Sequence, residues 1–388
     1  MQVKLYCRSR RRKRRAQLET AMSAQPNTGM QPVQFENPMG VDGFEFVEFA
    51  APDPGLLHAL FPRMGFTAVA RHRGKRVTLY RQGDCNFLVN EEPGAFAMEF
   101  ARQHGPCAAG FAIRFSKPAR WVREQALGNG AETIGALEST KAVDAPVIKG
   151  IGGCMLYLVD RYGVKGGAYD AEFEYLPGVA RDPMGYGLTF IDHLTHNLHF
   201  GHMEQWADYY AKLFNFREIR YFDIKGAKTG LVSKAMTAPD GMVRIPLNES
   251  SDPKSQINEY IDEYKGEGIQ HIACFTDDIH ATVEAMRAAG VEFLDTPDAY
   301  YEVVDQRIPG HREDVARMAR NKILIDADAE TRQAAAADLH AELRRPDFLR
   351  DHPAQGQPRF GEGNFQALFE SIERDQMQAR GAVSDAGP

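Results

Sequence analysis

Two apolar stretches of the chain each carry a histidine at a position where a metal ligand could lie. Residues 191–198 (IDHLTHNL) contain His193 and His196, and residues 268–275 (GIQHIACF) contain His271 at their centre. The short apolar runs predict a β-strand in both places. Neutral imidazole is a common ligand of iron, zinc and copper, so two such strands side by side would form one metal site. A histidine on one strand alone is more often a hydrogen-bonded structural residue, and the second strand is what favours a metal.

The elements that must position these histidines follow one order twice. Phe46 and Gly110 hold, in the first copy, the places that His193 and His271 hold in the second, so only the second copy can bind a metal. The repeat predicts an α+β fold of two βαβββ-type modules in tandem. The first copy consists of a strand at 43–52, a helix at 56–66, strands within 76–91, a strand at 110–115 and a helix at 121–127. The second copy consists of a strand at 189–198, a helix at 203–214, strands at 217–222, 229–236, 242–249 and 268–275, and a helix at 279–289.

The composition is that of an ordinary globular protein. The 388 residues are 43% hydrophobic and 26% charged, and no apolar run approaches the roughly 20 residues that a membrane span needs. At this length two modules, each with its own core, are expected. The cysteines are scattered and never spaced as CxxC, which argues against a disulfide framework or a thiolate zinc site. We therefore expect a cytoplasmic protein that does not bind membranes.

The first 35 residues differ in charge from the rest of the chain. The net charge is −7, yet residues 1–22 hold eight basic residues against one acid, Glu19. The remaining body is acidic, which excludes a basic surface for nucleic acid. The arginine run could be a nucleic-acid tail or a targeting signal. Because no apolar segment accompanies it, we expect residues 1–35 to be a disordered tail, of which residues 1–30 are dispensable, with Met22 or Met30 as an alternative start.

Five ordered motifs carry a resemblance to a known family. They are IDHLTHN, IPLNE at 245–249, SQINEYID at 255–262, GIQHIA, and FGEGNFQALFESIERDQ at 360–376. From about residue 35 to residue 375, the chain resembles 4-hydroxyphenylpyruvate dioxygenase. The resemblance implies the vicinal-oxygen-chelate fold, with a metal-less module at 36–182, an iron- and substrate-binding module at 183–380, and a C-terminal lid helix. It also implies an enzyme of tyrosine and phenylalanine catabolism that converts 4-hydroxyphenylpyruvate and O2 to homogentisate and CO2.

The resemblance makes His193 and His271 two of three ligands of a non-haem iron(II), the third being a glutamate. Two imidazoles and one carboxylate on one face of the ion leave positions for a 2-oxo acid and for dioxygen, so no separate 2-oxoglutarate is required. We interpret His196, His199 and His202 as bystanders. A strand places residue i+3 on the opposite face from residue i.

The resemblance also implies a polar and aromatic substrate wall. Its amide and hydroxyl groups would hold a phenol hydroxyl or an oxo-acid head through hydrogen bonds, although Asn248 could equally cap a turn. Residues 365–372 have apolar residues at helical spacing and resemble a lid helix, although such a stripe is also typical of core packing. The expected substrate-binding residues are Ser233, Asn248, Gln256, Gln270, Phe360, Asn364 and Phe365.

The chain departs from the family pattern at residues 331–359, which read TRQAAAADLHAELRRPDFLRDHPAQGQPR. In the family this segment forms two strands, and the second holds the glutamate ligand. A reading shifted by one nucleotide can spell two such strands. We hypothesise that residues 332–358 are out of frame, with Arg350 where the glutamate belongs and Ala337 where a substrate-contacting glutamine belongs. As printed, the alanine-rich start predicts a helix over 334–339, followed by a polar loop.

The printed segment leaves the third ligand open. A guanidinium cannot ligate iron, which excludes Arg350. The nearest carboxylates are those of Glu342, Asp347 and Glu362, and no pattern aims any of them at the histidines. We therefore expect the histidine pair to lack a completing carboxylate.

Two other functions stay open beside the dioxygenase. Hydroxymandelate synthase uses the same substrate and metal but hydroxylates the side-chain carbon. A catalytically dead paralogue would keep the pocket without a metal. Product analysis separates the first two functions, and metal content separates both from the third. The resemblance further implies a homo-oligomer, whose interface an edge strand of the metal-less module could supply.

Overall fold

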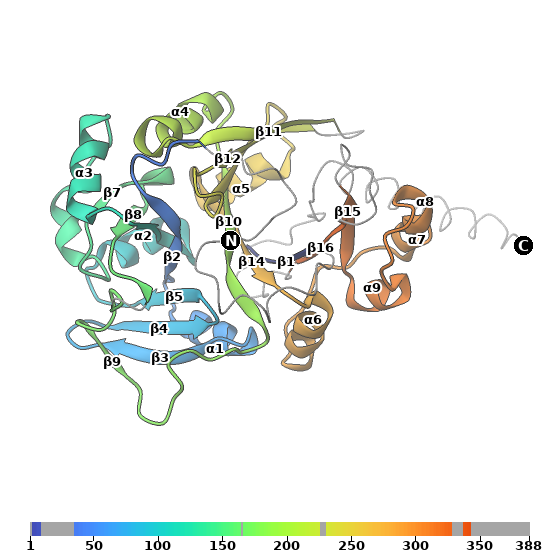
Figure 1. Cartoon of the computed structure of the whole chain (residues 1–388), viewed down its shortest axis with the longest axis horizontal. Helices are drawn as coiled ribbons and strands as arrows, with labels where there is room; N and C mark the ends of the chain where they lie inside the picture. The colour runs from blue at the N-terminus through green and yellow to red at the C-terminus, as the bar shows by residue number, and fades with distance from the viewer. Residues whose placement is uncertain (1, 9–34, 164–165, 226–229, 328–336, 343–388) are drawn as a thin grey trace, which may run out of the picture.

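The structure is a computed structural model that describes residues 2–8, 35–163, 166–225, 230–327 and 337–342. Its strands form two mixed eight-stranded sheets that lie side by side, with helices packed around them (Figure 1). The tandem α+β fold expected from the sequence is confirmed. Apart from β1 (Gln2–Arg8), which belongs to the second sheet, the change from one sheet to the other falls between β9, which ends at Tyr175, and β10, which begins at Leu188.

The first sheet has the strand order β7-β8-β6-β2-β5-β4-β3-β9. Its central strand β2 (Val41–Ala50) pairs antiparallel with β6 (Cys107–Phe115) and parallel with β5 (Cys85–Asn90). The other strands are β3 (Thr67–His72), β4 (Val77–Gln82), β7 (Val147–Lys149), β8 (Met155–Val159) and β9 (Phe173–Tyr175). The helices of this module are α1 (Gly55–Arg63), α2 (Phe96–His104), α3 (Ala119–Gly128), η2 (Gly135–Thr140) and η3 (Ile151–Gly153).

The second sheet has the strand order β11-β12-β13-β10-β14-β1-β16-β15. Its central strand β10 (Leu188–Asn197) pairs antiparallel with β14 (Gly268–Thr276) and parallel with β13 (Arg244–Glu249). The other strands are β1 (Gln2–Arg8), β11 (Arg217–Lys225), β12 (Gly230–Thr237), β15 (Leu324–Ala327) and β16 (Ala337–Glu342). The helices are α4 (Met203–Phe214), α5 (Gln256–Tyr264), α6 (Ile279–Ala288), α7 (Asp298–Tyr301), α8 (Val304–Arg307) and α9 (Val315–Asn321).

The two sheets repeat each other in register as well as in order. Phe46 on β2 and His193 on β10 each lie opposite an alanine of the next strand, β6 or β14. Gly110 and His271 each lie two residues before that alanine. The equivalence expected from the sequence, with Phe46 and Gly110 in the places of the two histidines, is therefore confirmed.

In the first module, aromatic side chains fill the position that corresponds to the histidine pair. Phe46 and Tyr157 are fully buried and meet edge to face, with ring centroids 5.0 Å apart. Tyr169 and Phe173 belong to the same buried cluster. On this face of the first sheet, the aromatic rings and the Glu48 carboxylate, which accepts a hydrogen bond from Tyr157, form a packed and buried core.

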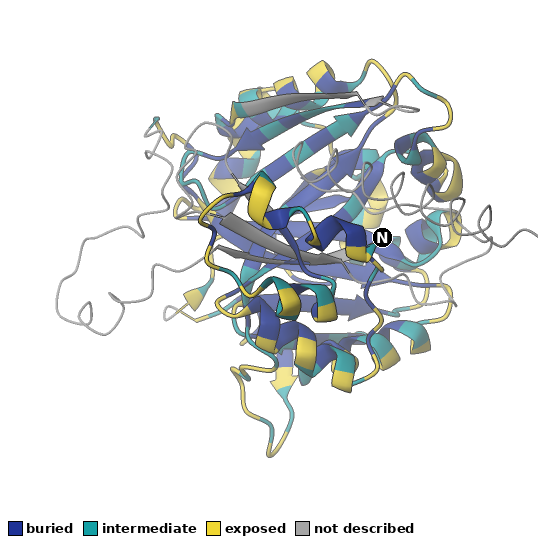
Figure 2. Ribbon diagram, turned by 90° about the vertical axis from the view of Figure 1, so that its right-hand side faces the viewer, coloured by how far each residue is buried: buried dark blue, intermediate teal, exposed yellow. Residues whose placement is uncertain are grey.

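A larger buried cluster runs through both modules and joins them. Phe115 on β6 packs against Phe214 at the end of α4, with ring centroids 5.6 Å apart. Figure 2 shows buried residues along the sheets and exposed residues on the outer surfaces of the helices.

Among the described residues no helix is long and apolar enough to cross a membrane. The four cysteines whose side chains are described are buried free thiols.

Strand β1 corrects one expectation from the sequence. Residues 1–35 are expected to be a disordered tail, but Gln2–Arg8 form a strand between β14 and β16, and the Leu5 side chain is fully buried. Val3, Leu5 and Cys7 alternate with polar or aromatic residues, which is the pattern of a half-buried strand. The alternation covers only a few residues, and the arginine-rich residues after it dominate the average composition of the segment. Residues 9–34 lie outside the described part of the chain.

Strand β16 corrects a second expectation. Alanine-rich residues 334–339 predict a helix, whereas Ala337–Glu342 pair antiparallel with both β1 and β15. Helix propensity is a weak preference, and two flanking strands that offer hydrogen-bonding partners override it. Residues 343–358, including Arg350 and Asp347, lie outside the described residues, as do Glu362 and the expected lid helix.

Candidate metal and substrate site

The two histidines singled out by the sequence meet on one face of the second sheet. His193 on β10 and His271 on β14 bring their Nε2 atoms within 3.3 Å of each other. The antiparallel register places Thr195 opposite His271, and the Thr195 hydroxyl lies 2.9 Å from His271 Nε2. Since His193 and Thr195 are two residues apart on one strand, their side chains share a face. The juxtaposition is therefore a product of strand pairing.

The other nitrogen of each ring is held by the residue that precedes it. His193 Nδ1 lies 2.8 Å from Asp192 Oδ2, and His271 Nδ1 is hydrogen-bonded to Gln270 Oε1. The β10/β14 ladder shifts register beside each histidine, between Ile191 and His193 and between Thr195 and His196. A bulge of this kind re-aims a side chain, which lets two consecutive residues reach the same site.

The geometry fits one metal ion shared by the two imidazoles. When Nδ1 donates to Asp192 or Gln270, Nε2 carries a lone pair, and two lone pairs facing each other are stabilised by a cation between them. Metal–nitrogen bonds of about 2.0–2.1 Å separate two ligand nitrogens by about 3.0 Å at a right angle and about 3.4 Å at a tetrahedral angle. The observed Nε2–Nε2 distance of 3.3 Å lies within that interval.

The electrostatics favour the neutral, ligating form of His271. Burial, followed by the positive charge of Lys4, holds the pKa of His271 well below its ordinary value. A buried imidazole that stays neutral at physiological pH is ready to bind a cation without first losing a proton. Asp192 is itself oriented by Arg244 on β13, whose Nη1 lies 2.6 Å from Asp192 Oδ1. The chain Arg244–Asp192–His193 fixes the ring orientation as second-sphere carboxylates do in metal sites.

A third protein ligand does not lie among the described side chains. No group of three histidine, cysteine, aspartate or glutamate residues in that part of the chain could hold a metal ion. Asp192 faces the Nδ1 side of His193, where it orients the ring. For Glu342 the structure describes the backbone position in β16 and not the side chain.

The polar substrate residues expected from the sequence lie in three places. Ser233 on β12 lies opposite Asn248 on β13, and Asn248 lies beside Asn197 on β10, with its Nδ2 3.4 Å from Asn197 Oδ1. Gln270 contacts His271 directly. Gln256 lies at the first turn of α5, half-buried, next to the capping Ser255.

The strands therefore bring Ser233 and Asn248 together in a polar row, and Gln270 to the histidines. Phe360, Asn364 and Phe365 lie outside the described residues. The three nearby histidines that we interpreted as bystanders have other partners. His196 Nε2 lies 2.8 Å from the Tyr210 hydroxyl, His202 Nδ1 lies 2.6 Å from Glu267, and the backbone of His199 also donates to Glu267.

Sequence reasoning missed three residues of the site. Asp192 directly precedes a candidate ligand, so its adjacency was a usable signal, and Thr195 follows at i+2 on the same face. Arg244 comes 51 residues later in the chain than His193 and had no local signal; the parallel pairing of β10 with β13 places it opposite His193.

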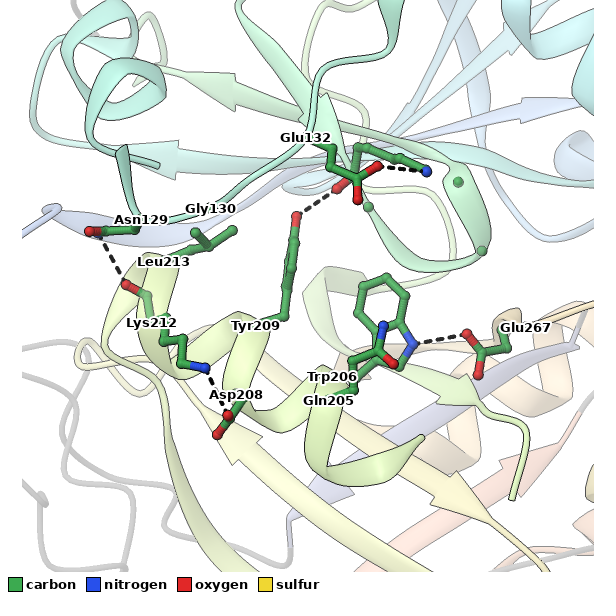
Figure 3. Close-up of a pocket in the computed structure, with 14 residues that line it drawn as sticks. Asn129, Gly130, Glu132, Gln205, Trp206, Asp208, Tyr209, Lys212, Leu213 and Glu267 are labelled. Carbon is green, nitrogen blue, oxygen red and sulfur yellow. Dashed lines mark hydrogen bonds and ion pairs between the residues drawn. The ribbon is translucent and has the colours of Figure 1, made fainter. Parts of the chain in front are cut away.

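A separate hollow of about 730 Å³ lies between the two modules (Figure 3). Neither histidine of the pair lines it. Several of its polar groups are engaged with one another: the Tyr209 hydroxyl donates to the Lys149 carbonyl, and Trp206 Nε1 donates to Glu267. These contacts join α4 to the first module and to the loop before β14, so the hollow is part of the inter-module contact.

Comparison with known proteins places the chain in a family. Residues 35–174 match the family described as hydroxyphenylpyruvate dioxygenase, N-terminal, and residues 190–303 match the glyoxalase/bleomycin resistance protein/dioxygenase superfamily. The chain is 49% identical to a 4-hydroxyphenylpyruvate dioxygenase of Pseudomonas sp. (strain P.J. 874), covering 90% of this chain and 99% of that protein. It is 48% identical to a 4-hydroxyphenylpyruvate dioxygenase of Pseudomonas aeruginosa, covering 90% of this chain and 98% of that protein.

A solved structure agrees with the fold. A triple mutant of 4-hydroxymandelate synthase from Streptomyces coelicolor superimposes with a TM-score of 0.65 at 21% identity, covering 87% of this chain and 99% of that one. The sequence identity over nearly the whole length of its relatives, together with the two-module fold, shows that the chain belongs to the 4-hydroxyphenylpyruvate dioxygenase family.

Proposed function

We propose that the second module is the catalytic centre of an iron(II)-dependent dioxygenase that converts 4-hydroxyphenylpyruvate and O2 to homogentisate and CO2. The observation that carries the proposal is the approach of His193 Nε2 to His271 Nε2 at 3.3 Å. The reaction balances without a further reductant, because both oxygen atoms of O2 are accounted for in the two products. When bound, iron(II) supplies the redox chemistry that lets dioxygen react with a 2-oxo acid.

The residues of this chain have distinct roles in the proposal. His193 and His271 hold the iron, and Asp192 and Gln270 keep their rings aligned through the Nδ1 atoms. The hydroxyl of Thr195 lies beside His271 Nε2, where it limits the movement of that ring.

The polar row Ser233, Asn248 and Asn197 offers hydroxyl and amide groups on neighbouring strands. Such groups can hold the phenol hydroxyl or the oxo-acid head of the substrate at a set distance from the iron. The proposal includes Gln256 as a further polar contact, and Phe360, Asn364 and Phe365 as the aromatic end of the pocket.

The third iron ligand is the open part of the proposal. The hypothesis that residues 332–358 are out of frame, with Arg350 in place of a glutamate, stays a prediction. A protein in which this segment is read one nucleotide later should gain iron affinity and homogentisate production together, because both depend on the same strand. Iron affinity rises with the number of ligands and with a deprotonated carboxylate.

The test uses the frame-restored protein beside the printed chain, both purified without oxygen and supplied with iron(II). Homogentisate and CO2 are measured after addition of 4-hydroxyphenylpyruvate and O2, and bound iron is measured by equilibrium dialysis. In the frame-restored protein, the variants His193→Ala and His271→Ala should each lose iron and turnover, whereas His199→Ala, a matched histidine away from the pair, should keep both. Stoichiometric iron in His271→Ala would refute the ligand assignment.

The same assay decides between the remaining functions. 4-Hydroxymandelate in place of homogentisate would favour the synthase, for which the present support is likeness of fold. Absence of bound iron from a well-folded, frame-restored protein would favour the dead paralogue.

We also propose a cytoplasmic location, since buried free thiols suit a reducing compartment, and a homo-oligomer formed through an exposed edge of the first sheet.

A further inference from the structure

The histidine pair has a third neighbour in the sheet, strand β1. It pairs in parallel with β14, and the register places Lys4 opposite Ala273. Ala273 in turn lies opposite His193, so a single row crosses β10, β14 and β1. The side chain between His193 and Lys4 in this row is only a methyl group.

Lys4 points to the same face of the sheet as the histidines. Its neighbour Leu5 is fully buried in the core cluster shared by the two modules. Successive side chains of a strand point to opposite faces, so Lys4 lies on the other face, that of His193 and His271. The effect of the Lys4 charge on His271 is consistent with this placement.

The first module shows what a side chain at this position can reach. Strand β8 lies parallel to β6 and antiparallel to β7, as β1 lies parallel to β14 and antiparallel to β16. Tyr157 on β8 lies opposite Ala112 and therefore occupies the place of Lys4. Its ring packs on Phe46 at 5.0 Å, and its hydroxyl donates to Glu48 at 2.7 Å.

The strand register shows which residues of the second module occupy the equivalent positions. Phe46 corresponds to His193, and Glu48, opposite Gly110, corresponds to Thr195, opposite His271. By this equivalence, a side chain at the position of Lys4 can reach both His193 and the neighbourhood of Thr195 and His271. Lys4 lies near the N-terminus of the chain, and its strand β1 lies between β14 and β16 in the second sheet.

We propose that Lys4, carried on strand β1 from the N-terminal end of the chain, forms the third side of the two-histidine site and lowers its affinity for divalent cations. The proposal rests on the proposed function, in that it takes His193 and His271 as metal ligands. An ammonium group beside a dication is repulsive, and the repulsion is strong where burial excludes water. A carboxylate in the same place reverses the sign of that interaction and adds a third ligand of the type found in facial triads.

The test is a cobalt(II) titration of the full chain, followed by the visible absorption of the bound ion and by equilibrium dialysis. Lys4→Glu should bind cobalt(II) at least about tenfold more tightly than the unaltered protein, within the 10- to 100-fold effects typical of residues that tune a metal site. Lys4→Met, which keeps the length of the side chain and removes the charge, should fall between them. Lys117→Glu makes the same charge change in the first module and should leave the affinity unchanged.

The outcomes separate this inference from the proposed function. Equal cobalt(II) affinity of Lys4→Glu and the unaltered protein, both folded by circular dichroism and urea unfolding, would overturn the role of Lys4. In the Lys4→Glu background, His193→Ala should abolish the gain. If His193→Ala removes the increase in cobalt(II) affinity, residue 4 and His193 share one site. If the increase persists, the proposal is wrong. A failure of cobalt(II) to bind to any of the folded proteins would overturn the histidine site itself, and the proposed function with it. Should Lys4→Glu not fold, Lys4→Gln gives the neutral comparison, and an affinity equal to that of the unaltered protein would again refute the role of Lys4.

Discussion

Replacing Asp192 with asparagine tests whether the site depends on its supporting residues as well as on its ligands. Asp192 is 4% exposed, and its two carboxylate oxygens serve two donors, His193 Nδ1 at 2.8 Å and Arg244 Nη1 at 2.6 Å. Asparagine keeps the shape of the side chain but has one acceptor oxygen, so one of the two donors loses its partner. The variant also leaves the Arg244 charge without its counter-ion.

The size of the effect follows from the burial of the pair. Breaking a fully buried ion pair costs about 3–5 kcal/mol. The Arg244 side chain is 19% exposed, so water compensates part of the loss, and we expect the free energy of unfolding to fall by about 2–3 kcal/mol. A misaligned His193 ring should weaken metal binding about 10- to 100-fold, the usual cost of removing the group that orients a ligand.

Two measurements on Asp192→Asn separate support of the metal from support of the fold. Cobalt(II) affinity is measured by dialysis, and stability by urea unfolding. The control is Asp208→Asn on α4, which removes an exposed partner of Lys212 and should cost less than about 1 kcal/mol with no change in metal affinity. Metal affinity within twofold of the unaltered protein, together with lower stability, would show that Asp192 supports the fold alone and would refute the orienting role.

Two further predictions concern stability. A chain that begins at residue 9, or one with Leu5→Asp, should lose at least about 2 kcal/mol of unfolding free energy, because a fully buried leucine and the β1 ladders are lost; an unchanged urea midpoint would restore the dispensable-tail interpretation. Burial lowers the pKa of His196 to about 3, against about 6.5 in the unfolded chain, so the unfolded state binds more protons between these values and stability should fall with decreasing pH through that window by about 1.4 kcal/mol per pH unit. His196→Gln should flatten this acid dependence in urea unfolding at pH 4–6, and an unaltered slope would contradict the assignment.

Local sequence patterns determined much of what the structure contains. Periodicity within about ten residues predicts the strands that carry the motif histidines and the amphipathic helix Met203–Phe214. The recurrence of those patterns predicts the repeat of two modules. The place of Phe46 and Gly110 in the first module was readable for the same reason. Residue type and spacing alone indicated neutral imidazole as the candidate ligand and argued against a thiolate site.

Only the tertiary structure decided which strands lie next to one another, and therefore which side chains share the site. Arg244 reaches Asp192 because β13 pairs with β10, and Lys4 reaches the row of His193 because β1 pairs with β14. The bulges that let Asp192 and Gln270 hold their neighbouring histidines are likewise properties of a paired ladder. Sheet neighbours are set by hydrogen bonds and burial between segments far apart in the chain. A local pattern can therefore indicate that a strand forms, but the rest of the fold determines where the strand inserts.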